Sequence, residues 1–235
     1  MPSALLLTVR SACADALALL LPVSCAGCDE PDVVLCERCA LLLAPTPRRQ
    51  VIDAPGGSIP VWSGLAFDGV AARVVRAVKE EGRTGLVRAV APALRAALEC
   101  AETGLPGAVA LVPMPTSRAA YRRRGFRLPE LLLRRAGRRA TRPLRHARRT
   151  GDQRGLGRDA RRRNVEGSLV ARGDLSGMRV LLVDDVVTTG ASLAEAARAL
   201  RSAGAEVLGA ATVGATPRRF ARLGERGPDT FQTHR

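Results

Sequence analysis

The chain has 235 residues, 46% of them apolar, which is enough to bury the core of one sizeable domain and a small module and argues against global disorder. Aromatic residues make up only 3%, which excludes stacking on many bases of a single strand as the main activity. The net charge is +15, and residues 118–163, with 18 Arg and three acidic residues, account for all of it. This Arg-rich region is either a contact for phosphates or nucleic acid, or a solvated helical face.

The first 22 residues are apolar at the spacing of an amphipathic helix. They resemble a signal peptide in composition, but they lack a basic start, and Arg10 and Asp15 interrupt the apolar run. No segment reaches the roughly 20 apolar residues that a membrane span needs. We therefore expect a cytoplasmic protein with no membrane span, and a signal peptide is the alternative.

Four cysteines follow the pattern C-x2-C-x7-C-x2-C, at Cys25, Cys28, Cys36 and Cys39. Two such pairs supply the four thiolates of a tetrahedral zinc site, and Gly27 relieves the turn of the first pair. Because all four ligands are protein sulfurs, the Zn²⁺ would be structural and not catalytic. Two disulfides are the alternative, which a cytoplasmic setting disfavours.

The composition divides the chain into four parts: an N-terminal helix with the cysteine module (1–44), a linker (45–57), a main domain (58–216) and a basic, flexible tail (217–235). The linker assignment depends on three prolines and a Gly pair. Strands are expected at 61–67, 108–112, 179–183 and 206–213, and helices at 70–78, 86–98, 129–137 and 192–203. Strands that alternate with helices predict an α/β fold with a parallel sheet flanked by helices.

The segment VLLVDDVVTTGAS, residues 180–192, carries the most specific chemistry. Its apolar run predicts a strand buried on both faces, which ends in Asp184 and Asp185. Ligands of parallel sheets collect beyond the carboxyl ends of strands, and two carboxylates there can accept hydrogen bonds from vicinal hydroxyls. Residues 188–192 then open a helix with small and hydroxyl side chains, which suits a phosphate. Together they predict a site for a ribose 5-phosphate. An ordinary strand with an acidic turn and a Ser192 cap is the alternative, but it does not account for the Thr-Thr-Gly turn.

This segment resembles the 5-phosphoribosyl pyrophosphate (PRPP) motif of type I phosphoribosyltransferases. The wider pattern resembles the ComF family, competence-associated and phosphoribosyltransferase-like proteins that join a four-Cys zinc knuckle to such a domain. The resemblance covers most of the chain, in segments that occur in the expected order: LLLPVSCAGC with the second Cys pair, VVRAVKEEG, LVPMPTSRAAYRRRGF, Gln153 with Leu156, and Arg161 with Asn164.

The resemblance implies a type I phosphoribosyltransferase-like fold and a set of site residues. PRPP binding falls to Asp184, Asp185, Val187, Thr188, Thr189, Gly190, Ala191 and Ser192. A pyrophosphate loop falls to Lys79, Glu80, Glu81 and Gly82, with Arg118, Arg122 and Arg124 as a closing lid. Catalysis would depend on Asp184, Asp185 and Lys79, the only lysine of the chain. The family usually continues Arg-Gly-Phe with Asn-Gln, whereas this chain has Arg127 and Leu128, which puts contacts from those amides in doubt.

Three functions follow from these motifs. A transferase would move phosphoribose from PRPP to an acceptor, with Mg²⁺ bridging pyrophosphate and ribose oxygens. A non-catalytic PRPP-binding protein would serve competence or DNA uptake and contact single-stranded DNA through the Arg-rich region. A purely structural zinc protein would leave residues 184–192 unexplained. The sequence leaves the acceptor and the oligomeric state open.

Overall fold

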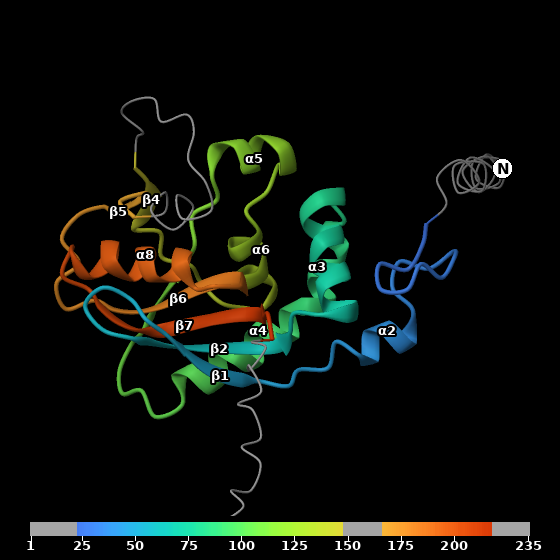
Figure 1. The fold of residues 1–235 in the computed structure, drawn as a ribbon, viewed down its shortest axis with the longest axis horizontal. Coiled ribbons are helices and arrows are strands. Elements are labelled where there is room, and N and C mark those ends of the chain that lie inside the picture. Colours follow the sequence, from blue (N-terminus) through green and yellow to red (C-terminus); the bar gives the residue numbers. More distant parts are fainter. Residues whose placement is uncertain (1–22, 148–165, 218–235) are drawn as a thin grey trace, which may run out of the picture.

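The computed structural model describes residues 23–147 and 166–217 (Figure 1). Its centre is a five-stranded sheet in the order β1-β2-β7-β6-β3, in which only β1 is antiparallel to its neighbour. The strands of this sheet are β1 (Arg48–Ile52), β2 (Ile59–Ala66), β3 (Ala110–Pro113), β6 (Arg179–Val187) and β7 (Glu206–Ala215). A separate two-stranded sheet pairs β4 (Leu144–His146) with β5 (Leu169–Ala171).

Helices cover both faces of the large sheet. The helices of the described residues are α2 (Glu37–Leu41), α3 (Gly69–Glu81), α4 (Val87–Glu102), α5 (Arg118–Arg124), α6 (Leu128–Arg135) and α8 (Ala191–Arg201), with a 3₁₀ turn, η1, at Thr84–Leu86. The side chains of α3, α4 and α6 form one buried cluster with one face of the sheet, and those of α8 form a second cluster with the other face. The result is a three-layer arrangement with the sheet in the middle (Figure 1).

Strand β6 shows why its sequence is a continuous apolar run. Leu181 and Val183 pack into the cluster of α3, α4 and α6, whereas Val180 and Leu182 pack into that of α8. Successive side chains of a strand point to opposite faces, so a strand covered on both sides needs apolar residues at every position. The sequence therefore identifies β6 as a central strand.

The predicted parallel sheet flanked by helices is confirmed. The predicted linker, residues 45–57, is in part wrong as local structure, because residues 48–52 form the edge strand β1 against β2. The strand expected to end at residue 183 extends to Val187 and includes both aspartates. The N-terminal helix, the tail, and the motif residues Gln153, Leu156, Arg161 and Asn164 lie outside the described residues.

Among the helices of residues 23–147 and 166–217, none is long and apolar enough to cross a membrane.

Candidate functional site

The two aspartates lie near the carboxyl end of β6, with β7 on one side and β3 on the other. Because they are consecutive strand residues, their side chains leave opposite faces of the sheet. Asp185 is 7% exposed and lies among Val75, Val78 and Leu132, on the side of α3 and α6. Both aspartates nevertheless border one cavity of about 410 Å³. Its described lining is Met114, Pro115, Thr116, Ser117, Ala120, Arg124, Pro129, His146, Ser168, Leu169, Asp184, Asp185 and Ser192.

Lys79 contacts this carboxylate pair from the neighbouring helix. Its Nζ lies 2.8 Å from Oδ1 of Asp185, and their side chains are 26% and 10% exposed. The sequence places Lys79 in a short loop, but α3 extends to Glu81 and only Gly82, at φ 71°, turns the chain out of the helix. Glu80 and Glu81 are exposed and are not part of the described cavity lining.

Asp184 lies in an environment that disfavours its charge. Burial, together with the negative charge of Asp185, raises the pKa of Asp184 to about 8. Two weaker effects oppose the shift: the backbone N–H of Asp185 donates to Asp184 Oδ1 at 2.8 Å, and the Lys79 ammonium lies nearby. A cation or a set of hydroxyl donors in the cavity would relieve this cost.

The loop that follows β6 has the shape of an anion site. Gly190 precedes α8 in the left-handed region, at φ 83°, and the side chains of Thr188, Thr189 and Ser192 are exposed. The first amides of a helix lack carbonyl partners within it, and the helix dipole favours an anion at the same end. Ser192 also lines the cavity, so the loop and the aspartates face one space. Val187 differs from its neighbours, because its side chain is buried in the core and leaves only its backbone for a ligand.

The loop after β6 packs on the edge strand β1, a contact that the sequence did not predict. A Cβ on Gly190 would lie 2.9 Å from Cγ2 of Ile52, so the edge strand β1 packs directly against the loop. Arg201 of α8 donates from Nη1 to the carbonyls of Pro55 and Gly57, at 2.7 and 2.8 Å. The apolar pair Val51-Ile52, followed by a Pro-Gly-Gly turn and a second β-branched run, is the signal that could have identified this hairpin.

A second structural contact near the cavity that the sequence did not predict is made by the buried carboxylate of Glu195. Glu195 on α8 is 4% exposed, accepts the N–H of Leu169 at 3.0 Å and forms an ion pair with Arg198. Arg198 in turn donates to the carbonyl of Leu169 at 3.1 Å. The pair therefore fixes β5, whose Leu169 lines the cavity, to the helix that begins at the loop. An isolated Glu on a helix gives no sequence signal for such a role.

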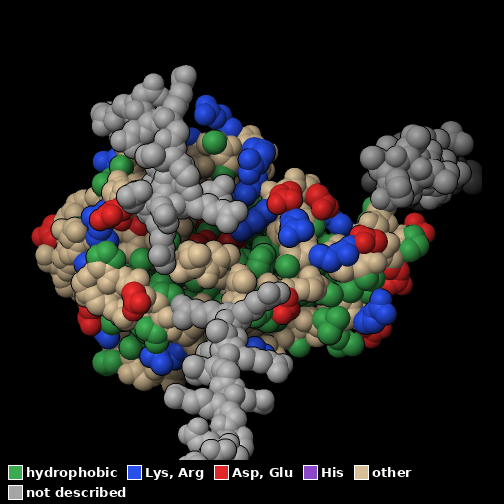
Figure 2. All heavy atoms as spheres, viewed as in Figure 1, with side chains coloured by type: hydrophobic (Ala, Val, Ile, Leu, Met, Phe, Trp, Pro, Cys, Tyr) green, Lys and Arg blue, Asp and Glu red, His purple; other side chains and the backbone are tan. Residues whose placement is uncertain are grey.

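The three arginines predicted to form a lid, Arg118, Arg122 and Arg124, do not all lie at the cavity. Arg124 lines the cavity, and its Nε is buried without a hydrogen-bond partner among residues 23–147 and 166–217. Arg118 and Arg122 are exposed on α5 and are not among the described lining residues. Figure 2 shows basic side chains gathered over this helix. Only Arg124 is therefore brought to the aspartates.

The structure explains the two residues, Arg127 and Leu128, that replace the usual Asn-Gln after Arg-Gly-Phe. Arg127 stacks over the ring of Tyr121 at 5.2 Å and pairs with Glu130 at 3.5 Å. Leu128, 2% exposed, packs in the core as the first residue of α6. Neither residue is among those that line the cavity in the described part of the chain.

The four cysteines meet at one point beside α3. Their sulfurs lie within 4.8 Å of one another, and those of Cys28 and Cys36 are 3.6 Å apart. Ligands of a tetrahedral Zn²⁺ at about 2.3 Å lie about 3.8 Å from one another, so the four-sulfur cluster fits the ion. A single shared centre also favours a metal over two separate disulfides. Cys25 Sγ accepts the N–H groups of Gly27 and Cys36, at 3.4 and 3.3 Å, as the outer contacts of a metal ligand do.

Comparison with known proteins identifies the domain. The phosphoribosyl transferase domain family matches residues 122–223. Competence protein F of Haemophilus influenzae is 33% identical over 129 residues, which are 52% of this chain and 56% of that protein. Orotate phosphoribosyltransferase of Mycobacterium leprae is 51% identical over 51 residues, 22% of this chain and 26% of that protein.

Among solved structures, adenine phosphoribosyltransferase from Saccharomyces cerevisiae aligns with 77% of this chain and 89% of its own, at 16% identity and a TM-score of 0.38. The chain spans about half the length of competence protein F and a quarter of the orotate enzyme. The chain thus carries a phosphoribosyl transferase domain match over residues 122–223, it is homologous to competence protein F over about half of its length, and its four-cysteine cluster lies N-terminal to the matched domain.

Proposed function

We propose that the protein binds PRPP together with Mg²⁺ in the cavity at the end of β6 and transfers its phosphoribosyl group to an acceptor, releasing pyrophosphate. One arrangement carries the proposal: Asp184, Asp185 and Ser192 face the same cavity, and the loop between them leads into the N-terminus of α8. Carboxylates suit the ribose hydroxyls, and the loop at a helix N-terminus suits the 5-phosphate.

The pyrophosphate would lie where the chain gathers positive charge. Lys79 approaches from α3, and Arg124 faces the cavity from α5 with a buried Nε for which the described part of the chain offers no acceptor. A buried donor without a partner is costly, so a ligand that accepts from it gains binding energy. Both cations would stabilise negative charge as it develops on the leaving group.

In the transfer, an acceptor atom would bond to C1 of the ribose while the bond from C1 to the pyrophosphate oxygen breaks and its electron pair leaves with pyrophosphate. Mg²⁺, held with PRPP beside Asp184 and Asp185, would neutralise negative charge on the leaving group. Asp184 and Asp185 would orient the sugar through its hydroxyls. Their negative charge would also stabilise the positive character of the ring in the transition state.

Calorimetric titration with PRPP and Mg²⁺ tests the binding step. We expect saturable binding to the wild type and its loss in Asp184→Ala/Asp185→Ala, because the variant lacks both hydroxyl acceptors. Asp174→Ala is the matched control, since Asp174 is an exposed carboxylate outside the cavity. Equal affinity in all three proteins would refute the site.

Pyrophosphate release tests the transfer step. With PRPP, Mg²⁺ and a panel of nucleobases, we expect release that depends on one acceptor and is lost in the double aspartate variant. PRPP binding without release across the panel would favour the second candidate, a PRPP-binding protein that does not turn PRPP over.

The second candidate is a competence protein that contacts single-stranded DNA, and the charge on α5 supports it. Arg118, Arg122 and Arg123 are exposed, and within the described residues they form no ion pair. We expect Arg122→Gln/Arg123→Gln to weaken binding of a single-stranded oligonucleotide and to reduce its salt dependence. Arg138→Gln/Arg142→Gln is the charge-matched control, because these two arginines already pair with Glu102 and Glu130. Affinity that does not change with salt would contradict this candidate.

A further inference from the structure

One side chain just beyond the C-terminal end of α3, that of Arg83, binds two segments of the cysteine module. Nη2 of Arg83 donates to the carbonyl of Ser24 at 2.7 Å and to that of Val34 at 2.9 Å. Ser24 precedes the first cysteine, and Val34 lies two residues before Cys36. The Val34 carbonyl also accepts the N–H of Ala26 at 3.1 Å. Arg83 therefore holds the two halves of the module together and to the main domain.

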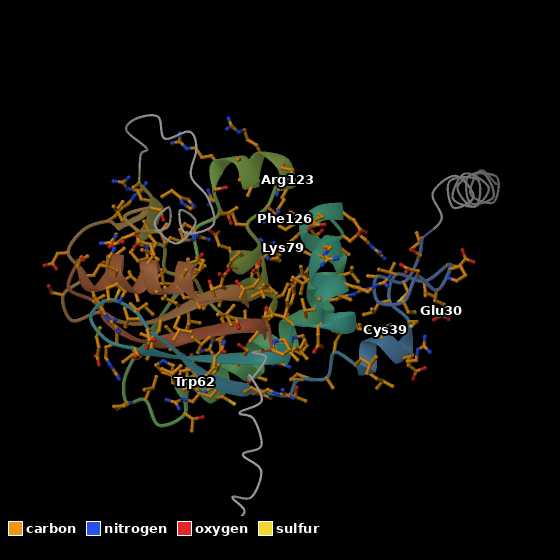
Figure 3. The ribbon with its side chains drawn as sticks, viewed as in Figure 1. Glu30, Cys39, Trp62, Lys79, Arg123 and Phe126 are labelled. Carbon is orange, nitrogen blue, oxygen red and sulfur yellow. The ribbon has the colours of Figure 1, made fainter. Side chains whose placement is uncertain are left out.

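The same residue lies next to the end of α3 that carries Lys79. Gly82, in the left-handed region, ends the helix, and the backbone N–H of Arg83 donates to the carbonyl of Ala77 at 3.3 Å. Lys79 lies one helical turn before Arg83 and reaches Asp185 at 2.8 Å. In Figure 3, Lys79 and Cys39 lie on opposite sides of α3. A continuous set of contacts thus runs from the module through Arg83 and the last turn of α3 to Asp185.

We propose that Arg83 is a positioning residue through which the cysteine module holds Lys79 against Asp185 in the proposed PRPP site; its effect on ligand affinity rests on the proposed PRPP binding. The last turn of a helix frays easily because its carbonyls lack intrahelical partners. A lysine side chain loses rotamer entropy when it is held in one position. When Arg83 is bound to the module, the entropy of ordering Lys79 is lost during folding and not during ligand binding. Lys79 is then already in position when the ligand binds.

An ion pair between the module and α3 provides a contrast. Arg73 pairs with Asp29, but the two side chains are 45% and 68% exposed, and Arg73 lies six residues before Lys79. Exposed pairs contribute little to stability, and this pair does not touch the last turn of α3. The Arg83 side chain is only 23% exposed and binds backbone carbonyls. Arg73→Gln is therefore the matched control.

The first experiment measures PRPP affinity in the presence of Mg²⁺, with the cysteine module loaded with zinc or stripped by a zinc-selective chelator that leaves Mg²⁺ in solution. We expect Arg83→Gln to weaken binding about fivefold or more. We expect Arg83→Lys to recover part of the loss, since an ammonium can still donate to a carbonyl, and Arg73→Gln to stay within twofold of the wild type. Removal of zinc should weaken PRPP binding by the wild type. It should change the PRPP affinity of Arg83→Gln little, because that variant already lacks the contact between residue 83 and the cysteine module.

The second experiment does not depend on any ligand. Hydrogen–deuterium exchange should accelerate over residues 78–83 in Arg83→Gln and in the zinc-stripped wild type, but not in Arg73→Gln. Wild-type protein that fails to bind PRPP would contradict the proposed function, and exchange would still decide the coupling. Unchanged exchange over residues 78–83 in Arg83→Gln, or chelation effects that add fully to those of the substitution, would overturn the role of Arg83.

Discussion

Asp184 is the side chain whose ionisation should reveal the site most directly. With a folded-state pKa of about 8 against an ordinary value of 3.8, it holds a proton in the folded protein that the unfolded chain releases between these values. We therefore expect Asp184→Asn to raise the free energy of unfolding at pH 8 by about 1 kcal/mol or more while it weakens PRPP binding. Urea denaturation at pH 5, 6.5 and 8 measures the first effect, and calorimetry the second.

The sign follows from the proton balance. The folded state binds more protons than the unfolded state between pH 4 and 8, so Asp184 lowers stability progressively as the pH rises through this window. The advantage of Asp184→Asn should accordingly grow from pH 5 to pH 8. Asp174 is the control, because hydrogen bonds from Ser176 lower its pKa, and Asp174→Asn should show no trend above pH 5. An advantage of Asp184→Asn that is the same at every pH would contradict the assigned environment.

The helices and strands that border the site differ in how readily the sequence reveals them. Strand β6 and helix α8 are predictable because an unbroken apolar run and a helical pattern follow directly from burial on two faces and on one. Strand β1 is not, because its burial is limited to one residue, Ile52, and its flanks are rich in Pro and Gly. An edge strand has one partner and one covered face, so its sequence is weakly constrained.

The contact between β2 and α4 depends on a residue with no side chain. A Cβ on Gly64 would lie 2.1 Å from the carbonyl oxygen of Ala93, which is backbone and cannot rotate away. We expect Gly64→Ala to lower the free energy of unfolding by about 3 kcal/mol or more, since the helix must move off the sheet. Chemical denaturation measures the loss.

Gly85→Ala is the control for this substitution, because a Cβ there meets nothing within 4 Å and its φ is not in the left-handed region. It should change stability by less than about 0.5 kcal/mol. Similar losses in the two variants would mean that Gly64 matters for backbone freedom and not for the close approach of α4.

At the scale of the molecule, the site joins segments that are far apart in the sequence, and this limits what the sequence alone can reveal. The aspartates and the loop are contiguous, so their roles can be read from one motif. Lys79 reaches Asp185 across 106 positions, and Ile52 reaches Gly190 across a greater distance. These contacts depend on how the layers pack, which local patterns do not encode. The resemblance to a known family, and not the local pattern, assigns Lys79 to this site.

The cysteine module belongs to the same folding unit as the main domain, because Ala26 and Leu43 are part of the buried cluster that contains Val74 and Val78. We expect the purified chain to hold one Zn²⁺, and Cys36→Ser to lose the metal. Since metal binding is coupled to folding, the variant should unfold in a single transition whose midpoint is lowered by about 5–10 °C. Metal analysis and calorimetry check the two effects.

Cys100→Ser separates this effect from the loss of any thiol, because Cys100 is exposed on α4, away from the module. It should retain the metal and the wild-type midpoint. Two separate transitions in Cys36→Ser would show that the module folds independently of the sheet, and Arg83 would then join two units that do not share their stability. A single lowered transition means that the module and the sheet unfold as one cooperative unit, so that metal binding stabilises both.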